Sequence, residues 1–268
     1  MTKGLDNAMH DIHHIDALAS RDQWMNQKHP LVKLLVTVFY IVMVVSFSKY
    51  DLSGLAAMFI YPFAGFMLSE ISFSDSLRRL KIVLPFVLII GILNPFLDKT
   101  AVQLGAFVVR GGVISMITLM MKCIFTVLAA YLLIATTTFE RICYALEQLH
   151  FPKIMITQIM LMYRYIFMLI NEVNRISQAY ALRAPGQNGI HISAWGSLVG
   201  QLLFRTIDRG TLVYESMVLR GYNGSFSYLR SREKIKGTDY AYLLIWIVLI
   251  SICRVVPVIM WIGNLVRF

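Results

Sequence analysis

The chain alternates between long apolar segments and shorter polar ones, a pattern typical of a protein that crosses a membrane several times. At ~1.5 Å per residue, the apolar segments approach or exceed the length needed to cross a bilayer core of about 30 Å. Pro62, Pro85 and the Asn94-Pro95 pair interrupt two of these segments and predict kinks there. We expect five transmembrane helices, at residues 31–48, 52–68, 82–97, 113–135 and 240–262.

The pattern changes between the fourth and fifth apolar segments. Residues 139–238 contain twelve Lys or Arg and six Asp or Glu, and no uninterrupted apolar run that we expect to span. Three amphipathic helices are predicted there, at 139–149, 152–183 and 194–220. The second and third carry polar stripes at helical spacing, formed by Thr157, Arg164, Asn171, Arg175 and Gln178 in one and by Gln201, Arg205, Asp208 and Glu215 in the other. The predicted fold class is therefore an all-α integral membrane protein with a block of three amphipathic helices inserted before the last span.

Basic residues near the span ends predict the orientation of the chain. Arg78, Arg79 and Lys81 lie between the second and third spans, and Arg230, Arg232, Lys234 and Lys236 lie just before the fifth. With five crossings both groups face the same side, which the positive-inside bias makes cytoplasmic. We therefore expect a multi-pass protein of the cell membrane, with a polar cytoplasmic leader at 1–30, spans within 31–138, a cytoplasmic block at 139–238 and a final span within 239–268.

Composition supports this class and argues against others. Of 268 residues 57% are hydrophobic, and the mean hydropathy is +0.65. The net charge of +10 fits basic cytoplasmic loops better than nucleic-acid binding, because no aromatic–basic interleaving accompanies it. The cysteines, Cys123, Cys143 and Cys253, are too few and too scattered for a disulfide framework. The first thirty residues are polar, so we expect no cleaved signal peptide.

Two predicted helices end in the same Leu-Arg-small pattern. Arg183 precedes Ala184 in "ALRAPG", and Arg220 precedes Gly221 in "VLRGYNG". Pro185-Gly186 predicts the first helix end, and Gly221 suits a left-handed cap at the second. Each Arg alone could simply complement the helix dipole. Two such ends favour a binding role, because an Arg held at a rigid helix end can offer a fork to a carboxylate.

Other polar residues invite specific chemistry. His10, His13 and His14 in "HDIHHID" could ligate a divalent metal, although their spacing is unremarkable and such leaders are often disordered. Lys122 and Arg254 lie within predicted spans with no evident acidic partner. Charges at that depth are often functional, but snorkelling or packing against protein would also explain them.

The chain resembles the transmembrane T component of energy-coupling factor (ECF) transporters, and within that group the cobalt-type CbiQ family. The resemblance covers essentially the whole chain. It is carried by the paired "ALRA" and "VLRG" helix ends before a final span, the entry segment "HPLVKLL" (29–35), the polar leader "HDIHHIDALASRDQWMNQKHP" and "VVSFSKYDL" (44–52). The first motif, Ala-Leu-Arg-Ala, departs from the family's commoner Ala-Arg-Gly form, so the contact made at Ala184 does not follow from the resemblance.

The resemblance implies a scaffold subunit without catalysis of its own. Its amphipathic helices would couple to two ATP-binding cassette ATPase subunits, and with the membrane domain they would hold a membrane-embedded substrate-binding subunit. ATP and Mg²⁺ would be used by the ATPases, and this chain would bind no cofactor. In agreement, the sequence has no G-x-x-x-x-G-K-[ST] motif. The implied ATPase-coupling residues are Ala181, Leu182, Arg183, Ala184, Leu219, Arg220 and Gly221.

Several alternatives remain open at this point. The substrate could be cobalt, nickel or a vitamin. An integral membrane enzyme is disfavoured, because the spans contain almost no carboxylates from which to build a catalytic set. A stand-alone channel or transporter is disfavoured by the absence of repeated spans and would leave the hundred-residue block unexplained.

Overall fold

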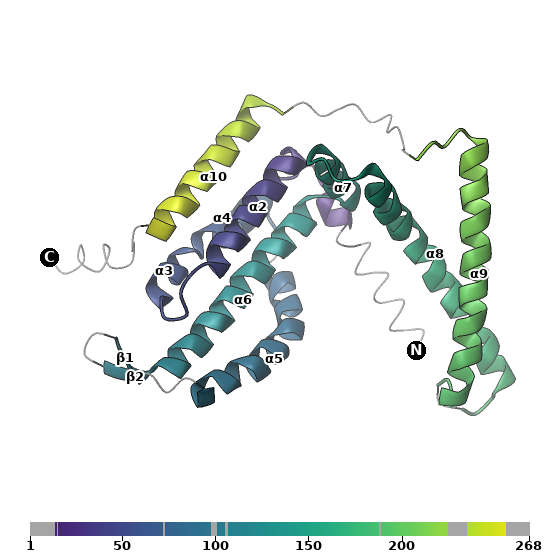
Figure 1. The fold of residues 1–268 in the computed structure, drawn as a ribbon, viewed down its shortest axis with the longest axis horizontal. Helices are drawn as coiled ribbons and strands as arrows, with labels where there is room; N and C mark the ends of the chain where they lie inside the picture. Colours follow the sequence, from purple (N-terminus) through teal and green to yellow (C-terminus); the bar gives the residue numbers. More distant parts are fainter. Residues whose placement is uncertain are drawn as a thin grey trace. The chain divides into compact units, whose positions relative to one another are not determined.

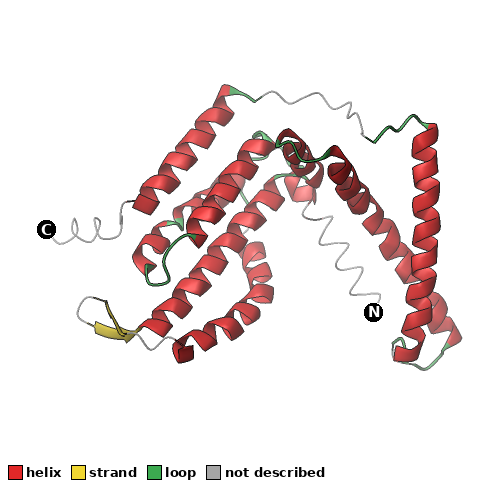
Figure 2. Ribbon diagram, viewed as in Figure 1, coloured by secondary structure: helices red, strands yellow, loops and turns green. Residues whose placement is uncertain are grey.

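A computed structural model describes residues 14, 16–71, 73–97, 101–104, 107–187, 189–224 and 235–255 of the chain. It is almost entirely helical (Figures 1 and 2). The elements are α2 (Pro30–Val45), α3 (Leu52–Ala57), α4 (Ile60–Ser69), α5 (Phe73–Leu97), β1 (Ala101–Leu104), β2 (Phe107–Arg110), α6 (Gly111–Thr136), α7 (Phe139–Gln148), α8 (Lys153–Arg183), α9 (Ile192–Leu219) and α10 (Gly237–Val255).

The chain divides into two compact units, which we describe separately. The membrane unit comprises Leu18–Ile142 and Glu233–Phe268, and the α8–α9 unit comprises Met1–Ala17 and Cys143–Arg232. Helix α7 begins in the first unit and ends in the second. The domain boundaries expected from the sequence, at residues 30, 138 and 238, stay predictions.

The membrane unit is built around α2, which packs against both α6 and α10. Tyr40 of α2 is fully buried, donates a hydrogen bond to the Met58 carbonyl at 2.9 Å and has its ring centroid 4.4 Å from that of Tyr61. Tyr61 in turn contacts the Trp246 ring of α10 edge-on. Because these aromatic side chains come from separate helices, they fix how the helices of this unit lie against one another.

The second predicted span is broken earlier than expected. We expected an interruption at Pro62, but the break lies at Met58–Phe59, between α3 and α4. Pro62 lies in the first turn of α4, where its missing N–H costs no hydrogen bond. Gly65 allows α4 to approach α6, because a Cβ there would lie 2.2 Å from the Leu132 side chain.

The regions around the third predicted span also differ from expectation. Helix α5 begins at Phe73, nine residues before the expected start of the third span, so Arg78, Arg79 and Lys81 lie within this helix. Pro85 and Pro95 both lie inside α5, which is drawn bent along its length in Figure 1. The segment between the spans expected at 82–97 and 113–135 contains an antiparallel pairing of β1 with β2, in the register Ala101↔Arg110 to Leu104↔Phe107. β-Branched residues in both strands favour this small exception to the all-α prediction.

Four segments are long and apolar enough to cross a membrane by length and composition: Leu52–Ser69, Gly111–Thr136, Lys153–Arg183 and Gly237–Val255. Pro30–Val45 and Val83–Pro95 are shorter apolar helices. The prediction of an α-helical, multi-pass membrane protein is confirmed. Helix α8 is among these segments although residues 139–238 were expected to hold no uninterrupted apolar run long enough to span, because its apolar residues outweigh its few charges over 18 residues.

Candidate functional site

Helices α8 and α9 carry the two Leu-Arg ends predicted from the sequence. Helix α8 ends at Arg183, a turn at 184–191 reverses the chain, and α9 then runs 28 residues to Leu219. At ~1.5 Å per residue α9 is about 42 Å long, so the Arg183 and Arg220 ends lie far apart (Figure 1). The structure therefore does not bring the two predicted site groups together. It places one at each end of α9.

The Arg183 end is stopped and braced by local contacts. The Ala184 amide donates to the Tyr180 carbonyl at 3.0 Å, after which Pro185 has no N–H to continue the ladder. The Tyr180 hydroxyl donates to Gln187 Oε1 at 2.9 Å and accepts from the His191 amide at 3.3 Å. The hydroxyl thus joins the last turn of α8 to the middle and the end of the reversal, which holds Arg183 at a defined place.

The Arg220 end has a different geometry. Gly221 is left-handed, with φ +83°, as the sequence predicted. Its amide donates to the Val218 carbonyl at 2.9 Å, and the Tyr222 amide donates to the Met217 carbonyl at 2.9 Å. This pair of bonds is a Schellman motif. Ala184, which occupies the equivalent place after Arg183, keeps a negative φ of −127°, since a Cβ disfavours the left-handed region.

The leucine of each motif points into solvent. Leu182 is 85% exposed and Leu219 is 88% exposed, and Arg183, Arg220, Ala181 and Gly221 are also exposed. Burying a leucine side chain stabilises an association by about 1.5–3 kcal/mol before other costs. A partner that covered either leucine would therefore gain this stabilisation, because the fold of the chain leaves both side chains in solvent.

The long faces of the two helices are also uncovered. No residue of α9 is buried, and only Ile156 and Thr157 of α8 are. A helix with an apolar face left open to solvent requires a partner or lipid. Large exposed apolar side chains along the pair include Met155, Met162, Trp195, Val199, Leu203, Phe204, Ile207 and Leu212.

One ion pair joins the predicted polar stripe of α9 to α8. Arg205 of the α9 stripe pairs with Glu172, which lies beside Asn171 on α8, and this contact ties the two helices together. Sequence reasoning missed Glu172, because a residue directly after a stripe member points about 100° away from the stripe on a helix. In the α8 stripe, Thr157 is buried, and the other four members are exposed.

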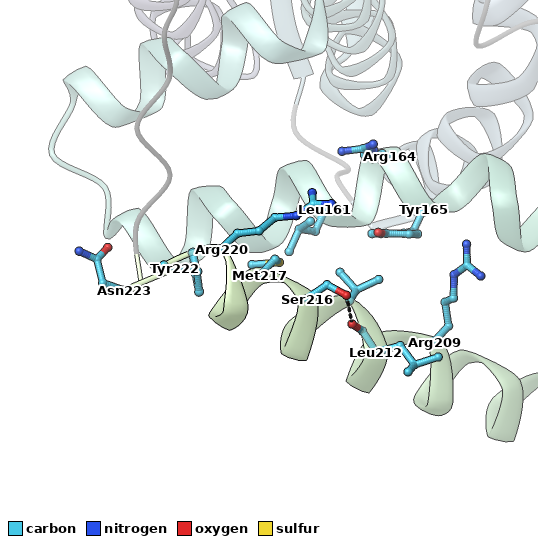
Figure 3. A pocket seen from close by; sticks show the side chains of 12 residues that line it. Leu161, Arg164, Tyr165, Arg209, Leu212, Ser216, Met217, Arg220, Tyr222 and Asn223 are labelled. Carbon is cyan, nitrogen blue, oxygen red and sulfur yellow. Dashed lines mark hydrogen bonds between the residues drawn. The ribbon is translucent and has the colours of Figure 1, made fainter.

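A hollow of about 620 Å³ lies between α8 and the last turns of α9, beside Arg220 (Figure 3). Three arginines line it: Arg164 from α8, and Arg209 and Arg220 from α9. Arg209 was not singled out from the sequence. Its spacing of eleven residues from Arg220, about three helical turns, places both on one face of α9.

Lys122 and Arg254 take backbone carbonyls as their partners. Lys122 Nζ donates to the carbonyls of Val45 at 3.0 Å and Phe47 at 2.6 Å. Arg254 donates to the Ser46 carbonyl at 3.1 Å, and its guanidinium lies 4.2 Å from the centre of the Phe47 ring. Both cations thus lie at the C-terminal end of α2, where carbonyls lack helical partners and the helix dipole is negative.

A second polar cluster lies in the membrane unit, next to the N-terminal ends of α2 and α10. Lys28 pairs with Asp239 of α10 at 3.9 Å, both side chains are buried, and Lys28 Nζ lies 4.3 Å from the centre of the Trp24 ring. Arg141 donates to the carbonyls of Asn26 and Lys28. Sequence reasoning missed this cluster because its members are distant along the chain.

Most of the histidine-rich segment "HDIHHID" lies outside the residues that the structure describes. His10 and His13 fall outside the described residues, and His14 is exposed. Among the residues that the structure does describe, no group of three or more His, Cys, Asp or Glu side chains is arranged to hold a metal ion. Metal binding by the leader stays a prediction.

Comparison with known proteins identifies a family for this chain. A family model described as "Cobalt transport protein", CbiQ, matches residues 21–231. An uncharacterized protein of Methanocaldococcus jannaschii is 33% identical over 144 residues, 53% of this chain and 49% of that protein. A putative fused cobalt transport protein CbiMQ of Methanocorpusculum labreanum is 25% identical over 60% of this chain and 25% of its own length.

A third relative is matched over most of its length. The energy-coupling factor transporter transmembrane protein EcfT of Clostridium kluyveri is 25% identical over 252 residues, 86% of this chain and 92% of that protein. The first two relatives, in contrast, are matched over half of their length or less. The family model itself covers every element from α2 to α9, including both Leu-Arg ends.

Proposed function

The chain belongs to the CbiQ family of cobalt transport proteins, and from that premise we propose that it is the membrane-embedded coupling subunit of an ECF-type importer. The resemblance drawn from the sequence is confirmed by the family match. In this proposal the chain catalyses no reaction. It transmits movement from two ATPase subunits to a substrate-binding membrane subunit, in the cell membrane and with α8 and α9 on the cytoplasmic side.

The observation that carries the proposal is the pair of exposed Leu-Arg ends. Each combines a leucine that the fold leaves in solvent with an arginine that has no carboxylate partner in the described part of the chain. An apolar anchor beside a guanidinium fork suits a groove that is apolar at its base and acidic at its rim. Two such ends about 42 Å apart are better matched to two separate subunits than to one small ligand.

The uncovered faces of α8 and α9 supply the second contact. Helix α8 reaches spanning hydropathy but also carries Arg164, Glu172 and Arg175, which would be costly in lipid. We assign its apolar face to the substrate-binding membrane subunit and the bilayer surface. The methionines Met155 and Met162 suit a contact that repacks as the ATPases open and close.

Cobalt is the proposed substrate. The family description and the printed name of the fused relative both specify cobalt transport, whereas the name of the EcfT relative specifies none. Cells that express the complete transporter should accumulate radiolabelled Co²⁺ in an ATP-dependent manner. Uptake of Ni²⁺ or of a vitamin in place of Co²⁺ would assign the chain to another branch.

Co-purification from membranes tests the coupling role. The R183E/R220E double variant should insert into membranes as the wild type does, since both side chains are exposed, but should lose both ATPase subunits. The K153E/R175E variant changes charge equally at exposed positions of α8 away from both ends and should keep them. Retention of both subunits by R183E/R220E at the wild-type ratio would contradict the proposal.

A further inference from the structure

The two Leu-Arg ends differ in charge. Around the Arg220 end, the hollow between α8 and α9 gathers Arg164, Arg209 and Arg220, and no Asp or Glu lines it. Figure 3 shows the side chains of Arg209 and Arg220 both reaching from α9 toward α8. Charge is sparser around the Arg183 end, because residues 176–182 of α8 and 192–204 of α9 contain no Asp, Glu, Lys or Arg.

The three arginines of the hollow form no ion pair within the described part of the chain. Within the described residues none of their side chains pairs with a carboxylate, whereas Arg205 on the same helix pairs with Glu172. Guanidinium groups gathered around one hollow repel each other, and no carboxylate of the described residues lies within ion-pair distance of them. An anionic occupant would offset it, and the planar fork of Arg is suited to binding oxygens in pairs.

The rest of the wall indicates what kind of anion fits. Met217 and Leu212 give the hollow an apolar side, and Leu219, next to Arg220, is exposed just beyond it. Tyr222 also lines it, fixed in place by the Schellman bond of its amide to the Met217 carbonyl. A rigid wall that is cationic on one side and apolar on the other suits a protein segment with both acidic and apolar side chains.

We propose that this hollow binds an acidic segment of one of the two ATPase subunits, through Arg164 and Arg209 as well as Arg220. This proposal rests on the proposed function and adds to it that the two docking ends are unequal. The Arg220 end engages at least two carboxylates of its ATPase subunit, whereas the Arg183 end engages its subunit through a single cation. The contact at the Arg220 end is therefore the more salt-sensitive of the two.

The experiment uses the full complex of this chain with its ATPase subunits and measures subunit ratios by native mass spectrometry at low and high salt. The R164Q/R209Q variant leaves both Leu-Arg motifs intact and replaces exposed residues, so it should fold as the wild type does. We expect it to keep one ATPase subunit and to bind the other at least about tenfold more weakly. The K153Q/R175Q variant removes the same charge elsewhere on α8 and should keep both subunits.

Each outcome bears on the proposal. Partial recovery of the second subunit in R164K/R209K, which restores charge without the guanidinium fork, would support it. Retention of both subunits by R164Q/R209Q with unchanged salt dependence would overturn it, and would leave the proposed function standing if R183E/R220E still loses them. It would also be overturned if R164Q/R209Q kept both subunits but lost binding to vesicles containing anionic phospholipid, since the occupant would then be a lipid headgroup.

Discussion

The buried Lys28–Asp239 pair offers a quantitative test of how the membrane unit is held together. It joins the segment before α2 to the first turn of α10, and its atoms lie 3.9 Å apart with side chains only 8% and 6% exposed. Asp239 Oδ2 also accepts a hydrogen bond from the Lys236 amide at 3.0 Å. Replacing Asp239 with Asn keeps an acceptor for that amide, so the change isolates the charge.

The magnitude follows from the distance and the burial. At 3.9 Å, with an effective dielectric constant of ~20, the gross attraction is about 4 kcal/mol. Much of this is offset by the cost of taking both charges out of water, but removing one partner leaves the other buried and unpaired, which costs about 3–5 kcal/mol. Because the Trp24 ring still faces Lys28, we expect D239N to destabilise the protein by about 3 kcal/mol, the lower end of that range.

Thermal unfolding in detergent measures this effect. About 3 kcal/mol corresponds to a fall in apparent Tm of roughly 6–12 °C, at ~2–4 °C for each kcal/mol. The K28M/D239N double variant, which removes both charges, should recover at least half of the loss. E172Q breaks the more exposed pair with Arg205 and should cost less than about 1 kcal/mol. If D239N lowered the Tm no more than E172Q does, the buried pair would not hold this unit together.

Two further substitutions test local features of the fold. G221A should destabilise the end of α9 by about 1 kcal/mol, because an L-residue is strained at φ +83° although nothing lies within 4 Å of the added Cβ. The backbone amides at positions 221 and 222 should then exchange hydrogen faster than in the wild type. Unchanged exchange would refute the strain argument. K122M removes the donors to the Val45 and Phe47 carbonyls and should lower the free energy of unfolding by about 1–2 kcal/mol, whereas K122R should retain most of the stability. An unchanged Tm of K122M would contradict a stabilising role for these contacts.

Local signals allowed most helix boundaries to be predicted from the sequence. The helix expected at 152–183 runs from Lys153 to Arg183, and the one expected at 194–220 runs from Ile192 to Leu219. Pro152, Pro185 and Gly221 act within one turn of their own position, so their effect does not depend on the rest of the fold. The Leu-Arg ends were found for the same reason.

Features created by tertiary packing could not be predicted in this way. The break at Met58 is stabilised by the Tyr40 hydroxyl, which comes from another helix. The carbonyl partners of Lys122 lie 75 and 77 residues away, so the residues near Lys122 in the sequence do not predict them. In the arginine hollow, the spacing of Arg209 and Arg220 was visible, but the approach of Arg164 depends on how α8 and α9 pack.

The central claim is that the two Leu-Arg ends dock two ATPase subunits, and site-specific photocrosslinking tests it most directly. A photoreactive residue replaces Leu182 or Leu219, the exposed leucines of the two ends, in the assembled complex. The account predicts that each position crosslinks to an ATPase subunit, and that a variant carrying both crosslinks to two subunits at once. Crosslinks from either position to lipid or to the substrate-binding subunit alone would contradict it.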